Sequence, residues 1–223
     1  MPAASPRIET FFLPGPAGRL ECILKHPLAE CVGETVGAAA VVCHPHPMFG
    51  GTMHNKVVHA AAEAIVREGL PAMRFNFRGT GGSGGRHDGG RGEQEDLAAV
   101  LDHLAGRYPG RPLLVAGYSF GAYVGLRVGC RDPRVAALVS IGTPLALYGF
   151  GFLRECGKPL SFIQGEMDPI GPLGLVLALA AVPPGGCRVM AVPGATHAFA
   201  DRLDDLGARV AEAIPPEMIG PTG

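Results

Sequence analysis

Short apolar runs alternate with longer segments of helical spacing through most of this chain, and this alternation restricts the fold more than any other feature. Strands joined by helical crossovers run parallel in one sheet that helices cover on both faces. Two further strands, "IETFFLP" and "RLECILKHP", come first and are joined by a turn at "PGPAG". The sequence therefore predicts an α/β fold with a mainly parallel central sheet. The later strands are expected at 38–45, 70–77, 111–117, 134–142, 159–165 and 187–194, and the helices at 56–69, 93–109, 120–130, 173–182 and about 198–214.

The length and composition of the chain fit one domain. Its 223 residues show no composition break and no linker, so residues 1–223 are expected to form a single domain with a core at about 7–214. A hydrophobic fraction of 47% is enough for a full core. The formal net charge of -1 gives no reason to expect nucleic acid or an anionic membrane as a partner.

The N-terminal stretch and the cysteines bear on the compartment. "MPAASPRIETFF" has no basic region followed by an apolar stretch, so a signal peptide is not expected. The longest apolar run, Leu173–Val182, has about half the length that a membrane span needs. We expect a soluble cytoplasmic protein with reduced thiols and no membrane partner, and the sequence leaves open whether it is a monomer or a homodimer. The cysteines are scattered, without a C-x-x-C pair, at 22, 31, 43, 130, 156 and 187.

Active sites of parallel α/β sheets gather at the carboxyl ends of the strands, so the residues that follow each strand matter most. The strand at 111–117 is followed by "GYSFG", which matches G-x-S-x-G between a buried strand and a helix. In this setting Ser119 is expected on a tight turn with its hydroxyl held above the sheet. Gly117 and Gly121 let the chain turn without side-chain clashes. The alternative is an ordinary turn in which the serine lies near the helix N-terminus.

A serine hydroxyl is a weak nucleophile and needs a base that an acid orients. Two later strand ends supply such residues, because "QGEMDPIG" places Asp168 after one strand and "PGATHAF" places His197 after the last. Asp168 precedes Pro169 and has an alternative interpretation as a plain turn residue. His197 has one as a structural residue at a helix start, although a protonated histidine there would oppose the helix dipole. Together these residues predict a catalytic triad of Ser119, His197 and Asp168.

The stretch "CHPHPMFGG" begins at Cys43 and places two histidines between prolines. The only acidic residue close to this stretch is Glu63 on the following helix, and Cys43 would point to the opposite face of its strand. A metal site usually needs a third or fourth ligand, often a carboxylate or a thiolate, and this stretch offers none in a suitable place. We therefore expect no metal and no cofactor. The histidines that a metal site would have used are His44, His46, His54 and His59.

The prolines of the same stretch suit a different role. A tetrahedral oxyanion is stabilised by about two backbone N–H donors. One is expected from Phe120, the residue after the nucleophile, and the other from a loop that follows an earlier strand. Pro45 and Pro47 have no N–H, so His46 is the residue between them that can donate. We predict the backbone N–H groups of His46 and Phe120 as the oxyanion hole, and expect His44 to brace the loop by a side-chain hydrogen bond.

The segment "GTGGSG", residues 79–84, formally matches the G-x-G-x-x-G dinucleotide motif after a strand. That motif requires a helix that begins at its last glycine. Here "GRHDGGRG" follows, and no helix is expected before about Glu93. We therefore expect no nucleotide, and interpret the segment as a flexible loop beside the site that hydrogen bonds of Arg78 anchor.

The motifs together resemble those of the α/β-hydrolase superfamily. "GYSFG", "GEMDP" and "GATHAF" resemble the superfamily as a whole, and "VVCHPHPMFGGTMHNKVV" with "FNFRGTGGSGG" resembles its small bacterial branch of dienelactone-hydrolase-like carboxylesterases. The resemblance extends from about residue 19 to 214. It implies an acyl-transfer hydrolase with Ser119 as nucleophile, His197 as base and Asp168 as orienting acid. Many relatives have aspartate where this chain has Asn76, a position that we interpret as structural.

Apolar residues near the predicted site bear on the substrate. The segment "TPLALYGFGFLRECG" is too short for a large lid domain. A small pocket open to solvent favours short-chain esters or lactones, so the expected partner is a small-molecule ester. The alternative from another class is a hydrolase-fold binding protein without activity. The expected pocket residues are Phe49, Leu147, Tyr148 and Ile170.

Overall fold

The computed structural model describes residues 6–28 and 36–219, and an eight-stranded sheet forms its centre. The strands lie in the order β1-β2-β4-β3-β5-β6-β7-β8. The first two strands form an antiparallel hairpin, β2 is antiparallel to β4, and all other neighbours are parallel, which confirms the predicted α/β fold. The strands are β1 (Ile8–Gly15), β2 (Gly18–Lys25), β3 (Ala39–Cys43), β4 (Ala72–Phe75), β5 (Leu113–Tyr118), β6 (Val135–Ile141), β7 (Leu160–Gly165) and β8 (Cys187–Val192).

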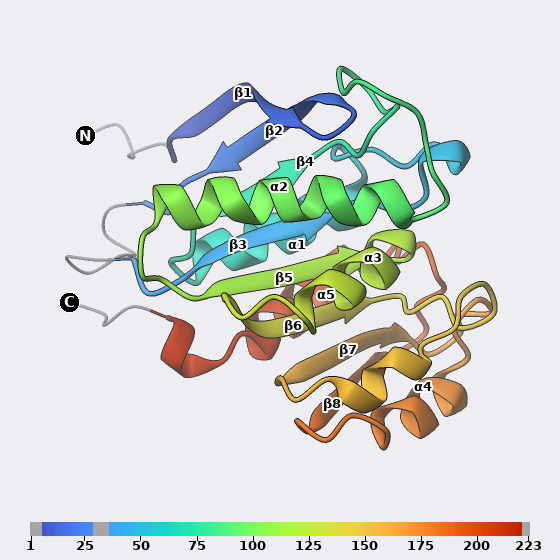
Figure 1. Ribbon diagram of the computed structural model, residues 1–223. Coiled ribbons are helices and arrows are strands. Elements are labelled where there is room, and N and C mark those ends of the chain that lie inside the picture. Colours follow the sequence, from blue (N-terminus) through green and yellow to red (C-terminus); the bar gives the residue numbers. More distant parts are fainter. Residues whose placement is uncertain (1–5, 29–35, 220–223) are drawn as a thin grey trace.

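Helices cover both faces of this sheet, and each face has its own apolar core. In β3 the side chains alternate, with Ala40 and Val42 in one core and Val41 in the other. The helices of the first core are α1 (Lys56–Arg67) and α5 (Leu203–Ala213), and those of the second are α2 (Arg91–Arg107), α3 (Phe120–Gly129) and α4 (Leu173–Ala180). Figure 1 shows α2 in front of the sheet and α1 behind it. None of the helices within the described ranges has the length and apolar character needed to cross a membrane.

Some element boundaries differ from the prediction. The last helix begins at Leu203 rather than near Ala198, because Phe199 has a φ of 51°, which is incompatible with a right-handed helix. In the described part of the chain, three short 3₁₀ helices were not predicted: η2 (Pro47–Phe49), η3 (Gly151–Glu155) and η4 (Pro216–Met218). Between β6 and β7 the chain holds only the short η3 segment, so no large lid domain covers the carboxyl ends of the strands.

Two of the cysteines contradict the prediction of reduced thiols. Cys130, which follows α3, forms a disulfide with Cys156, which follows η3. The two residues are 26 apart in the chain, and packing on the α2–α3 face brings their Cα atoms to 5.1 Å. Sequence spacing does not reveal a contact of this kind. Disulfides are typical of oxidising compartments and rare in the cytoplasm, so this bond does not support the predicted cytoplasmic location. That location stays a prediction. Cys22, Cys43 and Cys187 are free, and Cys31 lies outside the described residues.

The hairpin of β1 and β2 holds the glycine-rich segment that follows β4. The N–H of Gly84 donates to the carbonyl of Arg19 at 2.8 Å, and the N–H of Gly82 donates to the Glu21 carboxylate at 2.7 Å. The backbone N–H of Glu21 in turn donates to the hydroxyl of Ser83 at 2.9 Å. The antiparallel edge of the sheet thus fixes a loop that passes above the carboxyl ends of the parallel strands.

Candidate active site

Ser119 lies on a tight turn between β5 and α3. Its φ of 54° and ψ of -118° are unusual for a residue with a side chain, and such a conformation costs about 1–3 kcal/mol. The turn also demands glycine on either side. A Cβ atom on Gly117 would collide with the carbonyl of Gly121, and one on Gly121 would collide with the carbonyl of Cys43. The glycines of "GYSFG" therefore allow the turn to pack directly against the end of β3.

The structure brings together the three side chains that the sequence predicts as a triad. Nε2 of His197, in the loop after β8, lies 2.9 Å from Oγ of Ser119. Nδ1 of the same ring lies 2.7 Å from Oδ2 of Asp168, which follows β7. Ser119 and Asp168 are buried, and His197 is partly exposed. A continuous hydrogen-bonded path thus leads from a hydroxyl to a buried carboxylate.

The surroundings of Asp168 fix the orientation of this path. Its Oδ1 accepts hydrogen bonds from the backbone N–H groups of Ile170 and Gly171, at 2.8 and 3.1 Å. Its Oδ2 accepts one from Nε2 of Gln164 at 2.7 Å. Donors surround the carboxylate, so it acts as an acceptor toward His197 as well. Nδ1 of His197 therefore carries the proton, and Nε2 presents its lone pair to the serine hydroxyl.

Gln164 is a residue of the site that the sequence analysis missed. Its side chain is fully buried, and its Oε1 accepts the backbone N–H of Thr143 at 2.8 Å. Its Nε2 donates to the carbonyl of Gly171 as well as to Asp168. The available signal was an amide side chain near the end of the mainly apolar strand "LSFIQG", just before a candidate catalytic loop.

His46 and Phe120, whose backbone N–H groups are the predicted oxyanion donors, line the same cavity as Ser119. No acceptor within the described residues takes a hydrogen bond from either group. The carbonyl of His46 accepts the N–H groups of Phe49 and Gly51, and its Nδ1 accepts the N–H of Met48. His46 is thus held by its other polar groups, while its own N–H stays available for a ligand in the cavity.

His44 braces this loop, as predicted. Its Nε2 accepts the backbone N–H of Phe77 at 3.0 Å, so Nδ1 carries the proton and donates to the carbonyl of Pro45 at 2.6 Å. Burial lowers the pKa of His44 to about 4. The neutral ring therefore ties the loop after β3 to the chain after β4, and it leaves no lone pair for a metal. No group of three or more His, Cys, Asp or Glu in residues 6–28 and 36–219 is placed to hold a metal ion.

A cavity of about 590 Å³ opens beside Ser119 and His197. All four expected pocket residues line it. Phe49 is 84% exposed and Leu147 is 59% exposed, so these two lie at its mouth. Three further lining residues, Pro45, Asn55 and Tyr118, were not predicted. The hydroxyl of Tyr118 donates to the carbonyl of His197 at 3.0 Å. The lining consists of Pro45, His46, Phe49, Asn55, Tyr118, Ser119, Phe120, Leu147, Tyr148, Ile170 and His197, with no acidic side chain.

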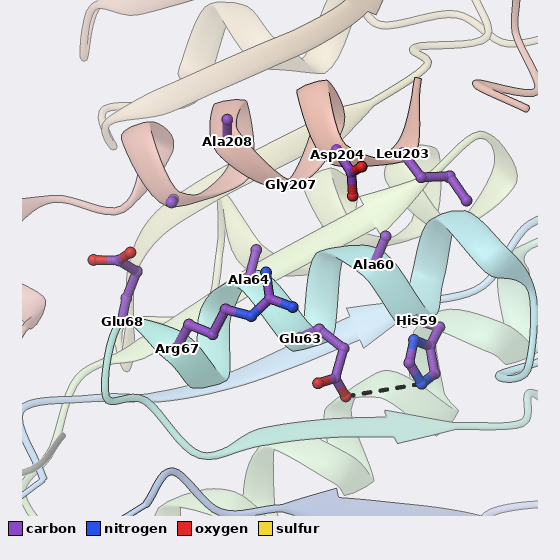
Figure 2. A pocket seen from close by; sticks show the side chains of 11 residues that line it. His59, Ala60, Glu63, Ala64, Arg67, Glu68, Leu203, Asp204, Gly207 and Ala208 are labelled. Carbon is purple, nitrogen blue, oxygen red and sulfur yellow. Dashed lines mark ion pairs between the residues drawn. The ribbon is translucent and has the colours of Figure 1, made fainter. Parts of the chain in front are cut away.

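A second cavity, of about 640 Å³, lies between α1 and α5 and is shown in Figure 2. Small residues of both helices form its floor, and charged side chains surround it. His59 lies 3.8 Å from Glu63 on the same helix, the contact marked in the figure. The lining contains no serine, cysteine or threonine, so this larger cavity lacks a nucleophile. The cavity beside Ser119 is therefore the candidate active site.

Arg78 and Asn76 have the structural roles expected of them. The guanidinium of Arg78 binds Asp96 through Nε and Nη2, and hydrogen bonding to that carboxylate raises the pKa of Arg78. Asn76 accepts the N–H of Met53 at 2.8 Å and donates to Glu21 at 2.7 Å, away from the triad. The next helix after "GTGGSG" begins only at Arg91, so the segment lacks the helix start that a dinucleotide motif needs.

Comparison with known proteins agrees with this geometry. A family model described as serine aminopeptidase, S33, matches residues 37–151. An α/β serine hydrolase homologue from Coxiella burnetii is 37% identical with a TM-score of 0.86, covering 93% of this chain and 97% of its own. A serine hydrolase from Xanthomonas campestris, described as without a lid, is 33% identical with a TM-score of 0.85, covering 96% of each chain.

A curated relative, an uncharacterized protein of Rickettsia prowazekii, is 38% identical over 160 residues. That match covers 70% of this chain and 65% of the relative, so the chain spans about two thirds of the relative's length. The family model covers residues 37–151, both solved structures share the fold over almost the whole chain, and the second of them also has no lid. The chain therefore belongs to the α/β-hydrolase superfamily and is one of its serine hydrolases.

Proposed function

We propose that this protein hydrolyses carboxylic esters through an acyl-enzyme formed on Ser119. The observation that carries the proposal is the hydrogen-bonded path from Ser119 through His197 to Asp168. A hydroxyl in this arrangement can lose its proton to Nε2 while its oxygen attacks a carbonyl carbon. The buried carboxylate stabilises the imidazolium that results.

The reaction follows from these positions in two halves. Attack by Ser119 gives a tetrahedral intermediate whose oxyanion accepts the N–H groups of His46 and Phe120. The intermediate collapses as His197 returns its proton to the leaving alcohol, and the acyl group stays on the serine. Water then attacks the acyl-enzyme and gives its proton to His197. The second collapse releases the carboxylic acid and restores the serine hydroxyl.

The lining of the cavity favours an ester over a peptide. An aminopeptidase must bind the protonated amino group of its substrate, which calls for a carboxylate close to the nucleophile. No described residue of the lining is acidic, and most are apolar. We propose esters of short acyl chains, or lactones, as the substrate class. The cavity is open to solvent, and without a lid a long acyl chain would have no apolar surface to cover it.

A substrate panel with a labelling experiment tests this function. We expect p-nitrophenyl acetate and butyrate to be hydrolysed faster than long-chain esters, and aminoacyl amides to be poor substrates. Ser119 should react with a fluorophosphonate probe, and Ser119→Ala should abolish both labelling and turnover. A wild-type protein that neither reacts with the probe nor hydrolyses any ester would favour the alternative, a hydrolase-fold binding protein. Equal rates for all chain lengths would contradict the substrate class alone.

A further inference from the structure

His87, in the glycine-rich segment, packs against both residues of the proposed oxyanion hole. Its ring centroid lies 4.6 Å from that of His46 and 5.5 Å from that of Phe120. The rings of His46 and Phe120 are themselves 4.9 Å apart. The three rings, which we call the ring cluster, thus join a loop after β3, the start of α3 and the segment before α2. Aromatic contacts at such distances prefer defined relative orientations.

Glu93 holds His87 in this position. The Glu93 side chain is fully buried, and Nδ1 of His87 lies 2.7 Å from its Oε1. This Nδ1 atom has no hydrogen-bond partner among the described residues, so the contact with Glu93 is a close packing contact and not a directed hydrogen bond. The carboxylate is itself fixed, because it accepts the backbone N–H groups of Asp88 at 3.0 Å and Gly90 at 2.8 Å. His87 therefore rests on a rigid support at the start of α2.

The side chain of His46 depends on this neighbour. Phe49 covers the ring of His46 at 4.8 Å but is itself 84% exposed, so that contact offers little restraint. His87 and Phe120 are the better-buried neighbours, and His87 has a side-chain exposure of 17%. Burial, followed by the charge of His87, lowers the pKa of His46, which favours the neutral ring whose Nδ1 accepts the N–H of Met48.

We propose that His87 is a positioning residue, which through the ring cluster holds the backbone N–H groups of His46 and Phe120 at the spacing that an oxyanion requires. The inference rests on the proposed function, because it concerns the same reaction. Donors stabilise an oxyanion only within a narrow range of distance, and displacements of about 0.5 Å are enough to weaken a catalytic site. His87 itself does not line the cavity beside Ser119.

The experiment compares His87→Ala, His87→Phe and the matched control His59→Ala, whose ring lies on α1 at the second cavity (Figure 2). Turnover of p-nitrophenyl butyrate gives kcat and KM. A trifluoromethyl ketone, which adds to the nucleophile and places an oxyanion in the hole, is compared with the matching methyl ketone. We expect His87→Ala to lower kcat about tenfold, less than the 10²–10³-fold cost of removing a donor outright. KM should stay within about twofold, while the trifluoromethyl ketone loses affinity as kcat does.

His87→Phe should recover kcat to within about threefold of wild type, because a ring of similar size restores the packing. His59→Ala should match wild type. A folded His87→Ala with unchanged kcat would overturn the inference, and so would equal losses of affinity for both ketones, which indicate general distortion. A His87→Phe variant as slow as His87→Ala would also overturn it. If His87→Ala does not fold, His87→Gln takes its place with the same expected losses. A wild-type protein without esterase activity or probe labelling would instead overturn the proposed function.

Discussion

The side-chain amide of Gln164 lies 2.7 Å from Oδ2 of Asp168, the same carboxylate oxygen that faces Nδ1 of His197. Gln164→Ala should therefore lower both stability and activity. It leaves the N–H of Thr143 and the carbonyl of Gly171 without their partner, at a cost of about 1–3 kcal/mol for each buried group. The loss of kcat should be smaller than the roughly 10⁴-fold effect of neutralising a triad acid. Urea unfolding and ester kinetics measure the two effects. Unchanged kcat in a destabilised variant would restrict Gln164 to folding.

Substitutions of His46 separate its backbone from its side chain. The φ of His46 is -55°, within the range that a proline ring imposes, so His46→Pro removes the N–H with little demand on this torsion. We expect kcat to fall by about 10²–10³, as it does when an oxyanion donor is lost. His46→Ala keeps the N–H but loses the ring contacts and the acceptor for Met48, so its loss should be clearly smaller. An alanine variant as inactive as the proline variant, with loss of a bound metal, would revive a metal role for this loop.

The buried ring of His44 makes stability depend on pH. Burial lowers its pKa to about 4 in the folded protein, against about 6.5 when the chain is unfolded. Between these values the unfolded chain binds more protons, so the stabilising contribution is complete above about pH 6.5 and is lost as pH falls toward 4. The loss amounts to about 3 kcal/mol from this group.

His44→Gln provides the comparison for that prediction, because glutamine does not titrate and can still accept the N–H of Phe77. The variant should be less stable than wild type at pH 7 but should lose less stability between pH 6.5 and 4. Urea unfolding at half-unit pH steps gives both curves. Parallel curves would contradict the prediction, because they would show that the pKa of His44 is the same in the folded and unfolded protein.

The disulfide between Cys130 and Cys156 should stabilise the fold. It closes a loop with a sequence separation of 26, for which chain entropy predicts about 3 kcal/mol. A Cys130→Ala/Cys156→Ala double variant should unfold at correspondingly lower urea, and dithiothreitol should destabilise wild type but not the variant. Mass spectrometry of a non-reduced digest should find the two cysteines in one cross-linked peptide. Equal stabilities with and without reductant would contradict the assignment.

The sequence was sufficient to predict the sheet and the three strand-end residues because both depend on local patterns. Ser119, Asp168 and His197 each follow a recognisable strand, and parallel strands bring their carboxyl ends to one edge of the sheet. The prolines around His46 limit backbone donors by chemistry alone, without reference to a partner. Each of these features can be predicted from a short stretch of sequence, without knowledge of the rest of the fold.

Contacts between distant segments could not be predicted in this way. Gln164 reaches Thr143 and Asp168 only once β6 and β7 are paired. Cys130 meets Cys156 through the packing of α3 and η3 on one face of the sheet, which no spacing rule describes. The start of α5 was misplaced because the positive φ of Phe199, a property of the folded loop, ends any helix there.

The N-terminal hairpin lies outside the region that the family model matches, yet it binds the glycine-rich segment beside the candidate site. The family match begins at residue 37, after β2, yet Arg19 and Glu21 bind Gly82 and Gly84 in the segment that leads to His87. A chain shortened to the matched region and everything after it would keep every residue of the triad and both oxyanion donors. It would lack both strands of the hairpin that binds the glycine-rich segment, so we expect the smallest fully active fragment to be longer than the motifs suggest.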